Sequence, residues 1–352
     1  MNKSDSERIA AILEKKSYKL ASTENEADLI LVNMCSVRQS AVDRVFGLSQ
    51  KLSQLKTKNP KLKTVLTGCI LKEDKIKFSK KFDLILDIKN LADWPKILKE
   101  NSEEILPEKD YSQGCYYLKI KPKYQNKFTA FIPISNGCNW KCSYCVVPFT
   151  RGKLVCRDHK EILEEVKEVI KKGYQEICLL GQNVNDYTSP SDPSIRFANL
   201  LELINDLPGD FQIRFEAPNP KNFSEELIEV IAKSEKVVKF LHLPVQSGDN
   251  EILKKMRRPY TVEQFKALVR KIREKIPEIK LSTDIIVGFP GETKEQFENT
   301  IKLMEEIKFD VAYIAKYSPR PGTAAFYLKD DVPWQEKKQR ENILRSLLKN
   351  PK

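Results

Sequence analysis

Three cysteines at the spacing C-x3-C-x2-C are the residues of this chain best suited to carry chemistry. Cys138, Cys142 and Cys145 follow the apolar run 131–134, in a stretch that we expect to form a loop. Three thiolates this close in sequence can converge on one point. A four-iron cluster needs a ligand on each iron, so three protein ligands would leave one iron open to a small molecule.

A zinc site and buried thiols without a ligand are the alternatives for these three cysteines. Zinc usually takes paired C-x2-C or Cys/His sets with a fourth protein ligand. The two histidines of the chain, His159 and His242, do not lie at such a spacing. We therefore favour the iron–sulfur interpretation.

The cysteine segment resembles the signature of the radical S-adenosylmethionine enzymes, with the aromatic Tyr144 before the last cysteine. This resemblance implies that Cys138, Cys142 and Cys145 hold a [4Fe-4S] cluster whose open iron chelates the amino and carboxylate groups of S-adenosylmethionine. It also implies that an electron from the cluster breaks the sulfonium C–S bond and releases a 5′-deoxyadenosyl radical. We accordingly expect Tyr144 to lie at the cofactor.

The composition fits a protein of two or three domains with a basic surface. The 352 residues are 41% hydrophobic, and Lys plus Arg outnumber Asp plus Glu by 61 to 49, a net charge of +12. This excess favours a polyanionic partner such as nucleic acid, although lysine-rich runs such as 72–81 also fit a solvated surface. No apolar stretch approaches the about 18 residues of a membrane span, and Met1–Ala10 is too polar for a secretory signal. Because eight cysteines also favour a reducing compartment, we expect a cytoplasmic protein with no membrane partner.

Residues 1–105 alternate between helical patterns and apolar strand patterns. Apolar runs at 27–34, 64–68 and 82–86 are separated by helical segments, which is typical of a doubly wound parallel sheet with covered faces. Cys35 and Cys69 directly follow the first two runs. The carboxyl ends of parallel strands share one crevice, so we expect the two thiols to share a ligand. The alternative for each cysteine is a small buried apolar residue.

The start of this domain departs from a complete α/β repeat. Its first helix begins almost at Met1, so the strand that should precede that helix is absent. Two thiolates are too few to hold a four-iron cluster securely. Residues 106–127 form a polar linker that contains Cys115, which we interpret as incidental.

Residues 128–330 repeat a strand-then-helix pattern six times. Six such units predict an open, partial β/α barrel whose open side can admit a bulky substrate. The chain ends in a short charged segment, 331–352, with a helical pattern. Functional residues of such barrels lie at the carboxyl ends of strands. The candidates there are Gly181, Gln182, Asn183, Glu216, Gln246, Asp284 and Arg320, which could also be ordinary loop residues or, for the last two, members of structural ion pairs.

Taken together, these segments resemble the methylthiotransferase family over nearly the whole chain. That family joins an N-terminal domain, which binds an auxiliary four-iron cluster through three cysteines, to a radical S-adenosylmethionine barrel. The resemblance implies that Cys35 and Cys69 are ligands of the auxiliary cluster and that the seven rim residues bind the cofactor. The segments that carry the resemblance are Asn2–Glu7, Asn33–Arg38, Thr67–Cys69, Pro148–Gly152 and Tyr317–Thr323, together with the cysteine loop.

Two further segments, Leu180–Asn185 and Ser282–Thr293, are most similar to the tRNA enzymes of this family. Those enzymes convert N6-isopentenyladenosine beside the anticodon to its 2-methylthio derivative. The resemblance implies a tRNA anticodon stem-loop as substrate, an electron donor such as flavodoxin or ferredoxin, and a monomer. The alternatives are methylthiolation of a ribosomal protein or of threonylcarbamoyladenosine, and an inactive protein that binds RNA or metal.

The sequence departs from the family pattern in three places. The first auxiliary-cluster cysteine of the family stands in a Gly-Cys-Gln segment just before the residues that correspond to Met1 and Asn2, so the third ligand is missing here. A start assigned at an internal methionine, or a degenerate form, would explain this. The family's RNA-binding TRAM domain has no counterpart after Lys352. Cys156–His159 and Glu216–Pro220 also differ from the Ser-Arg-Pro and Thr-Ser-His-Pro segments of the family.

Overall fold

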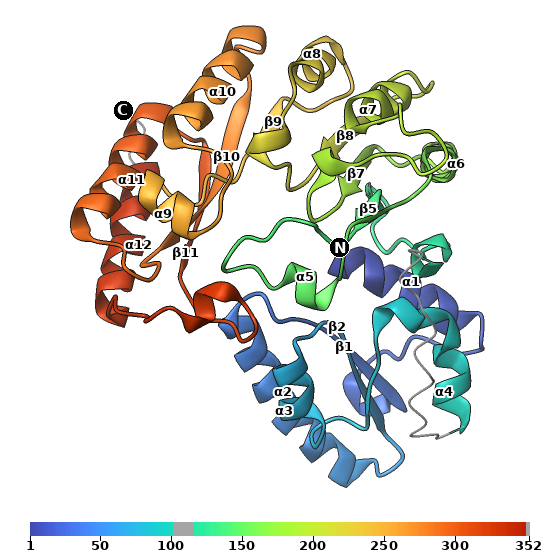
Figure 1. Ribbon diagram of the computed structural model, residues 1–352. Helices are drawn as coiled ribbons and strands as arrows, with labels where there is room; N and C mark the ends of the chain where they lie inside the picture. The colour runs from blue at the N-terminus through green and yellow to red at the C-terminus, as the bar shows by residue number, and fades with distance from the viewer. Residues whose placement is uncertain (101–115, 350–352) are drawn as a thin grey trace. The chain divides into compact units, whose positions relative to one another are not determined.

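The protein forms two compact units in a computed structural model that describes residues 1–100 and 116–349 (Figure 1). Cys115 lies outside the described residues. Within these residues, no helix is both long and apolar enough to cross a lipid bilayer. Unit 1 comprises residues 1–127, 136–138 and 146–155, and unit 2 comprises residues 128–135, 139–145 and 156–352.

A three-stranded parallel sheet in the order β1-β2-β3 forms the centre of unit 1. Strands β1 (Leu29–Cys35) and β2 (Lys63–Cys69) pair in register over their full length, so that their last residues are neighbours. Strand β3 (Leu84–Ile85) pairs with the middle of β2. The strands are rich in leucine and β-branched residues, which suit a buried pleated surface.

Helices cover both faces of this sheet. Successive side chains of a strand point to opposite faces, so Ile30 and Val32 of β1 pack in one core with Leu52, whereas Leu31 packs in a second core with Trp94. The prediction of a doubly wound sheet with covered faces is confirmed. The helices of unit 1 are α1 (Asn2–Glu14), α2 (Gln39–Lys58), α3 (Lys72–Phe78), α4 (Trp94–Glu100) and α5 (Val147–Thr150), with 3-10 turns at η1 (Glu24–Glu26), η2 (Ile88–Asp93) and η4 (Tyr116–Lys119).

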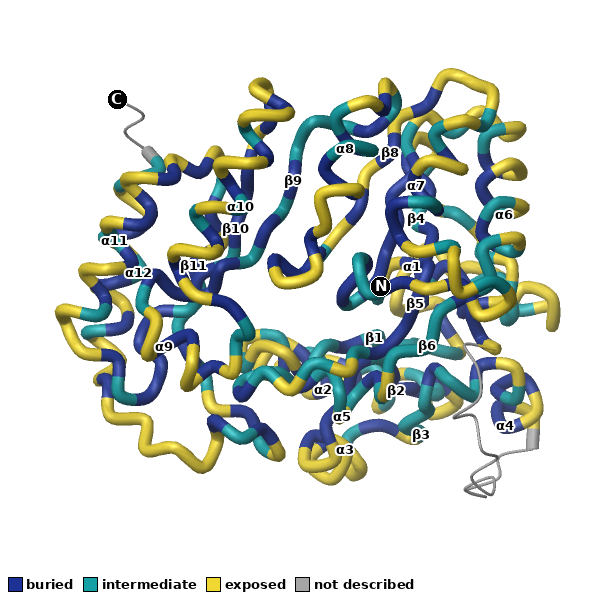
Figure 2. Tube along the Cα trace, turned by 45° about the horizontal axis from the view of Figure 1, so that its top comes forward, coloured by how far each residue is buried: buried dark blue, intermediate teal, exposed yellow. Residues whose placement is uncertain are grey.

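Two three-stranded parallel sheets, with the orders β4-β7-β8 and β11-β10-β9, form the centre of unit 2. In the part of the chain that the structure describes, they do not close into a barrel, as expected for an open β/α barrel. Strands β7 and β10 are mainly buried, as the trace at β10 in Figure 2 shows. Their bounds are β4 (Thr129–Pro133), β7 (Glu176–Leu180), β8 (Gln212–Phe215), β9 (Phe240–His242), β10 (Lys280–Val287) and β11 (Val311–Lys316); the two-residue strands β5 (Ser135–Asn136) and β6 (Val155–Cys156) lie at the borders of the units.

Five helices of unit 2, α6 and α8–α11, begin at side chains that cap them. Thr261 and Thr293 each accept a hydrogen bond from the N–H three residues on, and the side chains of Gln264 and Gln296 each accept one from the threonine N–H. The first of these two helices, α10, was not predicted from the sequence. The helices are α6 (His159–Lys171), α7 (Phe197–Asn205), α8 (Glu225–Lys233), α9 (Asn250–Lys255), α10 (Val262–Lys275), α11 (Lys294–Ile307) and α12 (Trp334–Lys349), with turns η5 (Val184–Asp186), η6 (Pro220–Asn222) and η7 (Ala324–Tyr327).

Candidate functional site

The in-register pairing of β1 and β2 places Cys35 and Cys69 side by side at the carboxyl end of the sheet in unit 1. Both thiols are free; Cys69 is buried and Cys35 is half-buried. The sequence predicted only that each cysteine follows a strand. The register of β1 and β2 shows in addition that the two cysteines are direct neighbours. The structure therefore brings these two predicted metal ligands together.

One buried arginine contacts this thiol pair. Nε of Arg151 donates a hydrogen bond to Sγ of Cys69 at 2.9 Å, and its Nη2 pairs with the Asp5 carboxylate at 2.6 Å. The side chains of Arg151 and Asp5 are 1% and 0% exposed, so the positive charge lies away from water, between one carboxylate and one sulfur. Arg151 also donates to Oδ1 of Asn2 at 2.8 Å and to the Tyr117 hydroxyl at 3.2 Å.

The two thiols share their acid–base behaviour. A hydrogen bond from Cys69 lowers the pKa of Cys35 to about 6, and the nearby Arg151 charge acts in the same direction. The same hydrogen bond, together with burial, raises the pKa of Cys69. Because the proton is shared, the pair as a whole holds one thiolate at neutral pH. The thiolate is the form of cysteine that binds metals.

Buried polar atoms without a hydrogen-bond partner lie near the thiol pair. Asn33 and Thr67 are neighbours across β1 and β2, two residues before the cysteines. Oδ1 of Asn33, Oγ1 of Thr67 and Oδ1 of Asp5 are buried and have no hydrogen-bond partner among the described residues. Native structures satisfy nearly all such groups. Unsatisfied atoms at one end of a sheet are therefore consistent with a bound water or ligand there.

Arg151, Asp5 and Asn2 were not among the predicted site residues. Arg151 stands in the segment Pro148–Gly152, which carried part of the family resemblance. Its position six residues after Cys145 is the one signal that could have marked it. Asp5 offers no such signal, because an acidic residue in the first turn of a helix is favoured by the helix dipole alone.

The three-cysteine loop is divided between the units, with Cys138 in unit 1 and Cys142 and Cys145 in unit 2. None of these three cysteines forms a disulfide, and all three are half-buried. The N–H of Cys138 donates to the Gly152 carbonyl at 3.1 Å, and the N–H of Cys145 donates to the Cys142 carbonyl at 3.1 Å. Among the described residues, no group of three or more His, Cys, Asp or Glu side chains is arranged to hold a metal ion. The assignment of the three ligands therefore depends on their chemistry and spacing.

A second arginine, which the sequence analysis did not identify, contacts this loop within unit 2. Nη1 of Arg258 donates to Sγ of Cys142 at 3.4 Å, and its Nε donates to the Tyr260 hydroxyl at 2.9 Å. Tyr144, the predicted aromatic of the loop, packs against a core cluster that contains Phe289, and burial raises its pKa, so its phenol is neutral.

Ser143 fixes the middle of the cysteine loop. Its N–H donates to the Met256 carbonyl at 3.0 Å and its hydroxyl donates to the Lys255 carbonyl at 2.8 Å. Its own carbonyl accepts a hydrogen bond from the N–H of Ala325 at 2.7 Å. The loop is thus held at the end of α9, where the last carbonyls of a helix are free to accept.

The loops after β7 and β8 meet through side-chain hydrogen bonds. Oδ1 of Asn183 accepts from the N–H of Asn219 at 3.2 Å, whereas the buried Nδ2 of Asn183 has no partner among the described residues. Gly181 is tightly packed, because a Cβ there would lie 2.7 Å from Oγ of Ser135. Gln182 is half-buried between these two residues, and Glu216 is exposed after β8.

The strands β9 and β10 bring two further predicted residues together. The N–H of Gln246 donates to the Asp284 carbonyl at 2.8 Å, and Gln246 has a positive φ of 74°. The Asp284 carboxylate lies 3.2 Å from Nε2 of His242, a partner that the sequence did not reveal. Arg320, the last predicted residue, is buried after β11, and its carbonyl accepts from Thr323.

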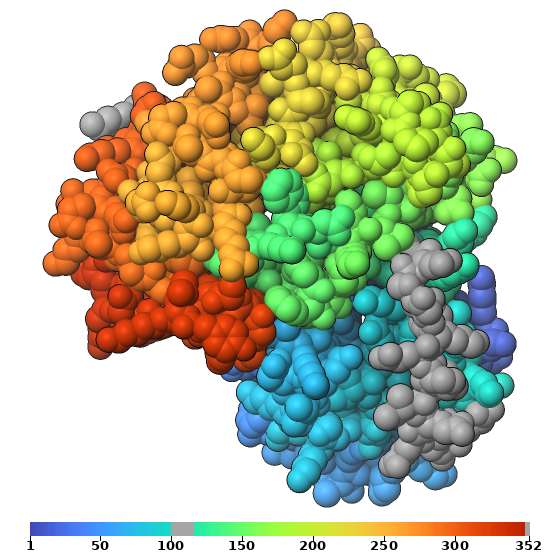
Figure 3. Space-filling view, viewed as in Figure 1, coloured from blue at the N-terminus to red at the C-terminus, as the bar shows by residue number. Residues whose placement is uncertain are grey.

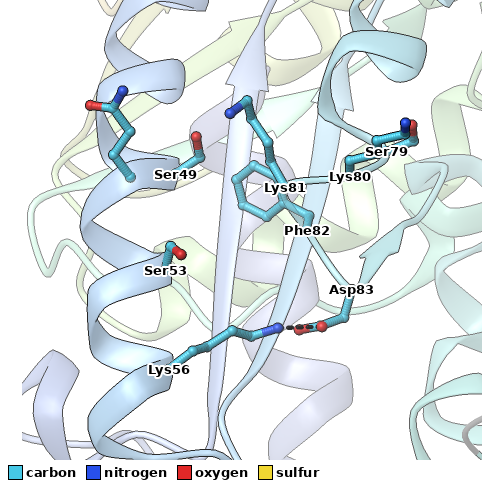
Figure 4. Close-up of a pocket in the computed structure, with 9 residues that line it drawn as sticks. Ser49, Ser53, Lys56, Ser79, Lys80, Lys81, Phe82 and Asp83 are labelled. Carbon is cyan, nitrogen blue, oxygen red and sulfur yellow. Dashed lines mark hydrogen bonds and ion pairs between the residues drawn. The ribbon is translucent and has the colours of Figure 1, made fainter.

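Two surface cavities contain none of these residues. The first, of about 440 Å³, lies in unit 1 beside α2 and α3 (Figure 4). The second, of about 430 Å³, lies in unit 2 beside the buried ion pair of Glu292 and Arg340, whose charged atoms are 2.7 Å apart.

Two known families match the sequence. The radical SAM superfamily matches residues 132–304, and an uncharacterized protein family, UPF0004, matches residues 1–87. The tRNA-2-methylthio-N(6)-dimethylallyladenosine synthase of Thermoanaerobacter pseudethanolicus is 42% identical over 340 residues, which cover 94% of this chain and 72% of that protein. The synthase of the same name from Carboxydothermus hydrogenoformans is 42% identical and covers 97% of this chain and 79% of that protein.

This chain belongs to the tRNA-2-methylthio-N(6)-dimethylallyladenosine synthase family. The resemblance to methylthiotransferases that the motifs indicated is thereby confirmed, and the superfamily match spans the cysteine loop and the loops after β7, β8, β9 and β10.

Solved structures support the fold of this synthase family member. The radical S-adenosylmethionine methyltransferase TsrM from Kitasatospora setae has a TM-score of 0.63 at 15% identity, covering 92% of this chain and 73% of that one. The cobalamin-dependent S-adenosylmethionine radical enzyme OxsB also has a TM-score of 0.63, at 14% identity, covering 98% of this chain and 52% of that one. At such identities the likeness concerns the fold alone.

Proposed function

We propose that this protein is a tRNA methylthiotransferase that attaches a methylthio group to C2 of N6-isopentenyladenosine beside the anticodon. The observation that carries the proposal is the 42% identity to synthases of that name over at least 94% of the chain. The matched length includes both sets of cysteines, the pair in unit 1 and the three-cysteine loop, none of which forms a disulfide. Two sets of sulfur ligands suit a reaction that needs both a radical and a sulfur atom.

In this proposal Cys138, Cys142 and Cys145 hold a [4Fe-4S] cluster, and Cys35 and Cys69 contribute two ligands to an auxiliary cluster. When bound, these groups would supply the electron that cleaves S-adenosylmethionine to a 5′-deoxyadenosyl radical and the sulfur that becomes the methylthio group. The donor chemistry fits, since all five residues are cysteines that form no disulfide. A third auxiliary ligand is not assigned to any residue of this chain.

Each of the two sets of cysteines has an arginine in contact with one of its sulfurs. Arg151 donates to Sγ of Cys69 from a buried position, and Arg258 donates to Sγ of Cys142. Hydrogen bonds and positive charge at ligand sulfurs also tune iron–sulfur sites. We assign both arginines as positioning residues, because each acts through a cysteine.

The rim loops of unit 2 would bind S-adenosylmethionine. Tyr144 offers a neutral aromatic surface beside the loop, Gly181 allows close approach of the backbone, and the unsatisfied Nδ2 of Asn183 is a buried donor. A buried donor without a partner is what a polar ligand would satisfy. The remaining assignments to the cofactor are Gln182, Glu216, Gln246, Asp284 and Arg320.

The substrate follows from the chemistry of the carbon that reacts. Adenine C2 carries a hydrogen that is neither acidic nor easily displaced, so a radical is a suitable means to remove it. The adenine must leave its stack to reach the active site, as for other enzymes that act on a base.

The proposal also includes a flavodoxin or ferredoxin as electron donor. It divides the chain into a domain at 1–105, a linker at 106–127, a domain at 128–330 and a final segment at 331–352.

Anaerobic reconstitution with iron and sulfide, followed by assay for 5′-deoxyadenosine and methylthiolated tRNA, tests this function. Both products are expected from the wild type and from Cys178→Ala, which removes a buried thiol of β7 that we do not assign as a ligand. Cys138→Ala should abolish both. Cys69→Ala should keep 5′-deoxyadenosine formation and lose the tRNA product. Full activity of Cys138→Ala would refute the ligand assignment, and methylthiolation of a ribosomal protein in place of tRNA would favour the alternative substrate.

A further inference from the structure

One part of unit 1 carries a large excess of positive charge. Between positions 51 and 81 the sequence contains ten lysines and two acidic residues, whereas the whole chain has a net charge of +12. These positions include the second half of α2 and all of α3. We use the name lysine face for the exposed lysines of this part together with the half-buried Lys81. They are Lys51, Lys58, Lys61, Lys72, Lys75, Lys77, Lys80 and Lys81.

Most of the lysine face is not neutralised by carboxylates. The ammonium groups of Lys58, Lys61, Lys72, Lys75 and Lys80 form no ion pair or hydrogen bond within the described residues. An ordinary solvated surface would mix charges of both signs. The face therefore keeps a strong positive potential, which attracts polyanions.

The helix α10 of unit 2 shows the contrasting arrangement. Lys266 pairs with Glu306, Lys271 pairs with Glu225, and Lys275 pairs with Glu229 at 2.9 Å. These lysines are exposed or nearly so, as on the lysine face, yet each has a carboxylate beside it. The lack of pairing on the lysine face is therefore a local property and not a result of composition.

A cavity lies within the lysine face (Figure 4). Its volume is about 440 Å³, and the residues that line it include Gln50, Ser53 and Lys80. None of these three side chains has a hydrogen-bond partner within the described residues. Lys56, which also lines the cavity, is paired with Asp83, as the dashed line in Figure 4 shows. Three unpaired donors around one cavity provide contacts suited to a phosphate group.

The ring of Phe46 in α2 contacts the ammonium groups of Lys77 and Lys81, and Lys81 also lines the cavity. Lys81 lies 4.3 Å and Lys77 lies 5.1 Å from the centre of the Phe46 ring. A ring attracts a cation without neutralising its charge. Both lysines are therefore held in place and remain available to an anion.

We propose that the lysine face binds the phosphate backbone of tRNA, a step that rests on the proposed function. The alternative partner of a basic surface is an acidic protein. A stable protein interface needs an apolar centre, and between positions 51 and 81 the single exposed large hydrophobic residue of the described chain is Ile76. Exposed ammonium groups around a cavity lined by amide and hydroxyl groups fit RNA better. The α3 part of the face can be followed in sky blue in Figure 3.

The test compares two variants that lose the same charge. Lys72→Gln/Lys75→Gln/Lys80→Gln removes three charges from the lysine face, and Lys266→Gln/Lys271→Gln/Lys275→Gln removes three from α10. Binding of unmodified substrate tRNA is measured by fluorescence anisotropy over a range of salt concentrations. We expect the first variant to bind at least about 10-fold more weakly, with a salt slope reduced by roughly 0.7–0.9 for each phosphate that the variant no longer neutralises. The α10 variant should bind like the wild type.

Equal tRNA affinity of the two variants would overturn the proposal, as would the absence of tRNA binding by the wild type. Slower reduction by flavodoxin in the first variant, with unchanged tRNA affinity and unchanged reduction by dithionite, would also overturn it and assign the face to an acidic protein. The proposed function fails separately, because it fails if bound tRNA is never methylthiolated. Formation of 5′-deoxyadenosine without tRNA should not change in either variant.

Discussion

Arg151 and Asp5 form a buried ion pair, with Nη2 and Oδ2 separated by 2.6 Å and neither side chain more than 1% exposed. The same guanidinium donates to Sγ of Cys69 through Nε. Asp5 belongs to α1 and Cys69 ends β2, so one side chain ties a helix to a sulfur at the end of the sheet. The position of that sulfur depends on the ion pair.

Removal of Asp5 should destabilise unit 1 strongly. We predict that Asp5→Ala lowers the free energy of unfolding by about 3–5 kcal/mol, because it leaves the Arg151 charge buried without a partner. Asp5→Ala/Arg151→Met should lose less than Asp5→Ala alone, since no charge is then left uncompensated. Urea unfolding measures both losses. Lys51→Ala breaks only the exposed ion pair with Glu24 and serves as the control. An equal loss of unfolding free energy in Asp5→Ala and Lys51→Ala would contradict a stabilising role of the buried pair.

Substitution by alanine should destabilise the protein at Gly68 and stabilise it at Gly47. Gly68 has a φ of 109°, and a Cβ there would lie 2.2 Å from the Met34 carbonyl, so Gly68→Ala must displace the end of β2 and with it Cys69. We expect a loss of stability above about 1 kcal/mol and a lower iron content. Gly47, inside α2, has no atom within 4 Å of an added Cβ. Gly47→Ala should stabilise the protein by about 0.5–1 kcal/mol. Thermal unfolding that ranks the two variants equally would contradict this account.

Alkylation of the metal-free protein should reveal the low pKa of Cys35. The folded pKa of about 6 is below that of a free thiol, about 8.5, so the thiolate fraction rises with pH through 6 and is nearly complete at neutral pH. Burial raises the pKa of Cys178 to about 12, so that thiol should stay unlabelled throughout. Iodoacetamide labelling between about pH 5 and pH 9, read by peptide mass spectrometry, measures both. Labelling of Cys35 that begins only above about pH 8 would disprove the shift.

Arg258 should affect the three-cysteine loop through its contact with Cys142. We predict that Arg258→Met lowers the reduction potential of the reconstituted site, because a positive charge near a cluster favours its reduced form. Arg258→Lys keeps the charge and should recover part of the shift. Spectroelectrochemical titration gives the potentials. Identical potentials in the wild type and the Met variant would show that Arg258 only supports the loop mechanically.

The sequence was sufficient to predict the parallel strands and their order of appearance. The apolar runs at 27–34, 64–68 and 131–134 lie within about two residues of the bounds of β1, β2 and β4, because each is a short apolar run. The helix α10 was not predicted. Its buried residues Val262, Phe265, Val269 and Ile272 are spaced for a helix, but charged residues separate them and the shorter α9 precedes them. Local patterns thus identify strands better than helices with a narrow apolar face.

The sequence could not predict the contacts that hold the candidate site. Arg151 lies 146 positions from Asp5 and 82 positions from Cys69, and Arg258 lies 116 positions from Cys142. Such contacts depend on the packing of elements that no local pattern describes. The cysteines themselves were found because their spacing and their positions after strands are local properties. The pairing of Cys35 with Cys69 needed the register of two strands.

Transfer of hydrogen from the substrate base tests the central claim most directly. A tRNA that carries deuterium at C2 of the isopentenyladenosine is incubated anaerobically with the reconstituted protein, S-adenosylmethionine and a reductant. Mass spectrometry then measures the deuterium in the 5′-deoxyadenosine formed. The account predicts one deuterium in 5′-deoxyadenosine for each methylthiolated tRNA. Methylthiolation that leaves 5′-deoxyadenosine free of deuterium would contradict it.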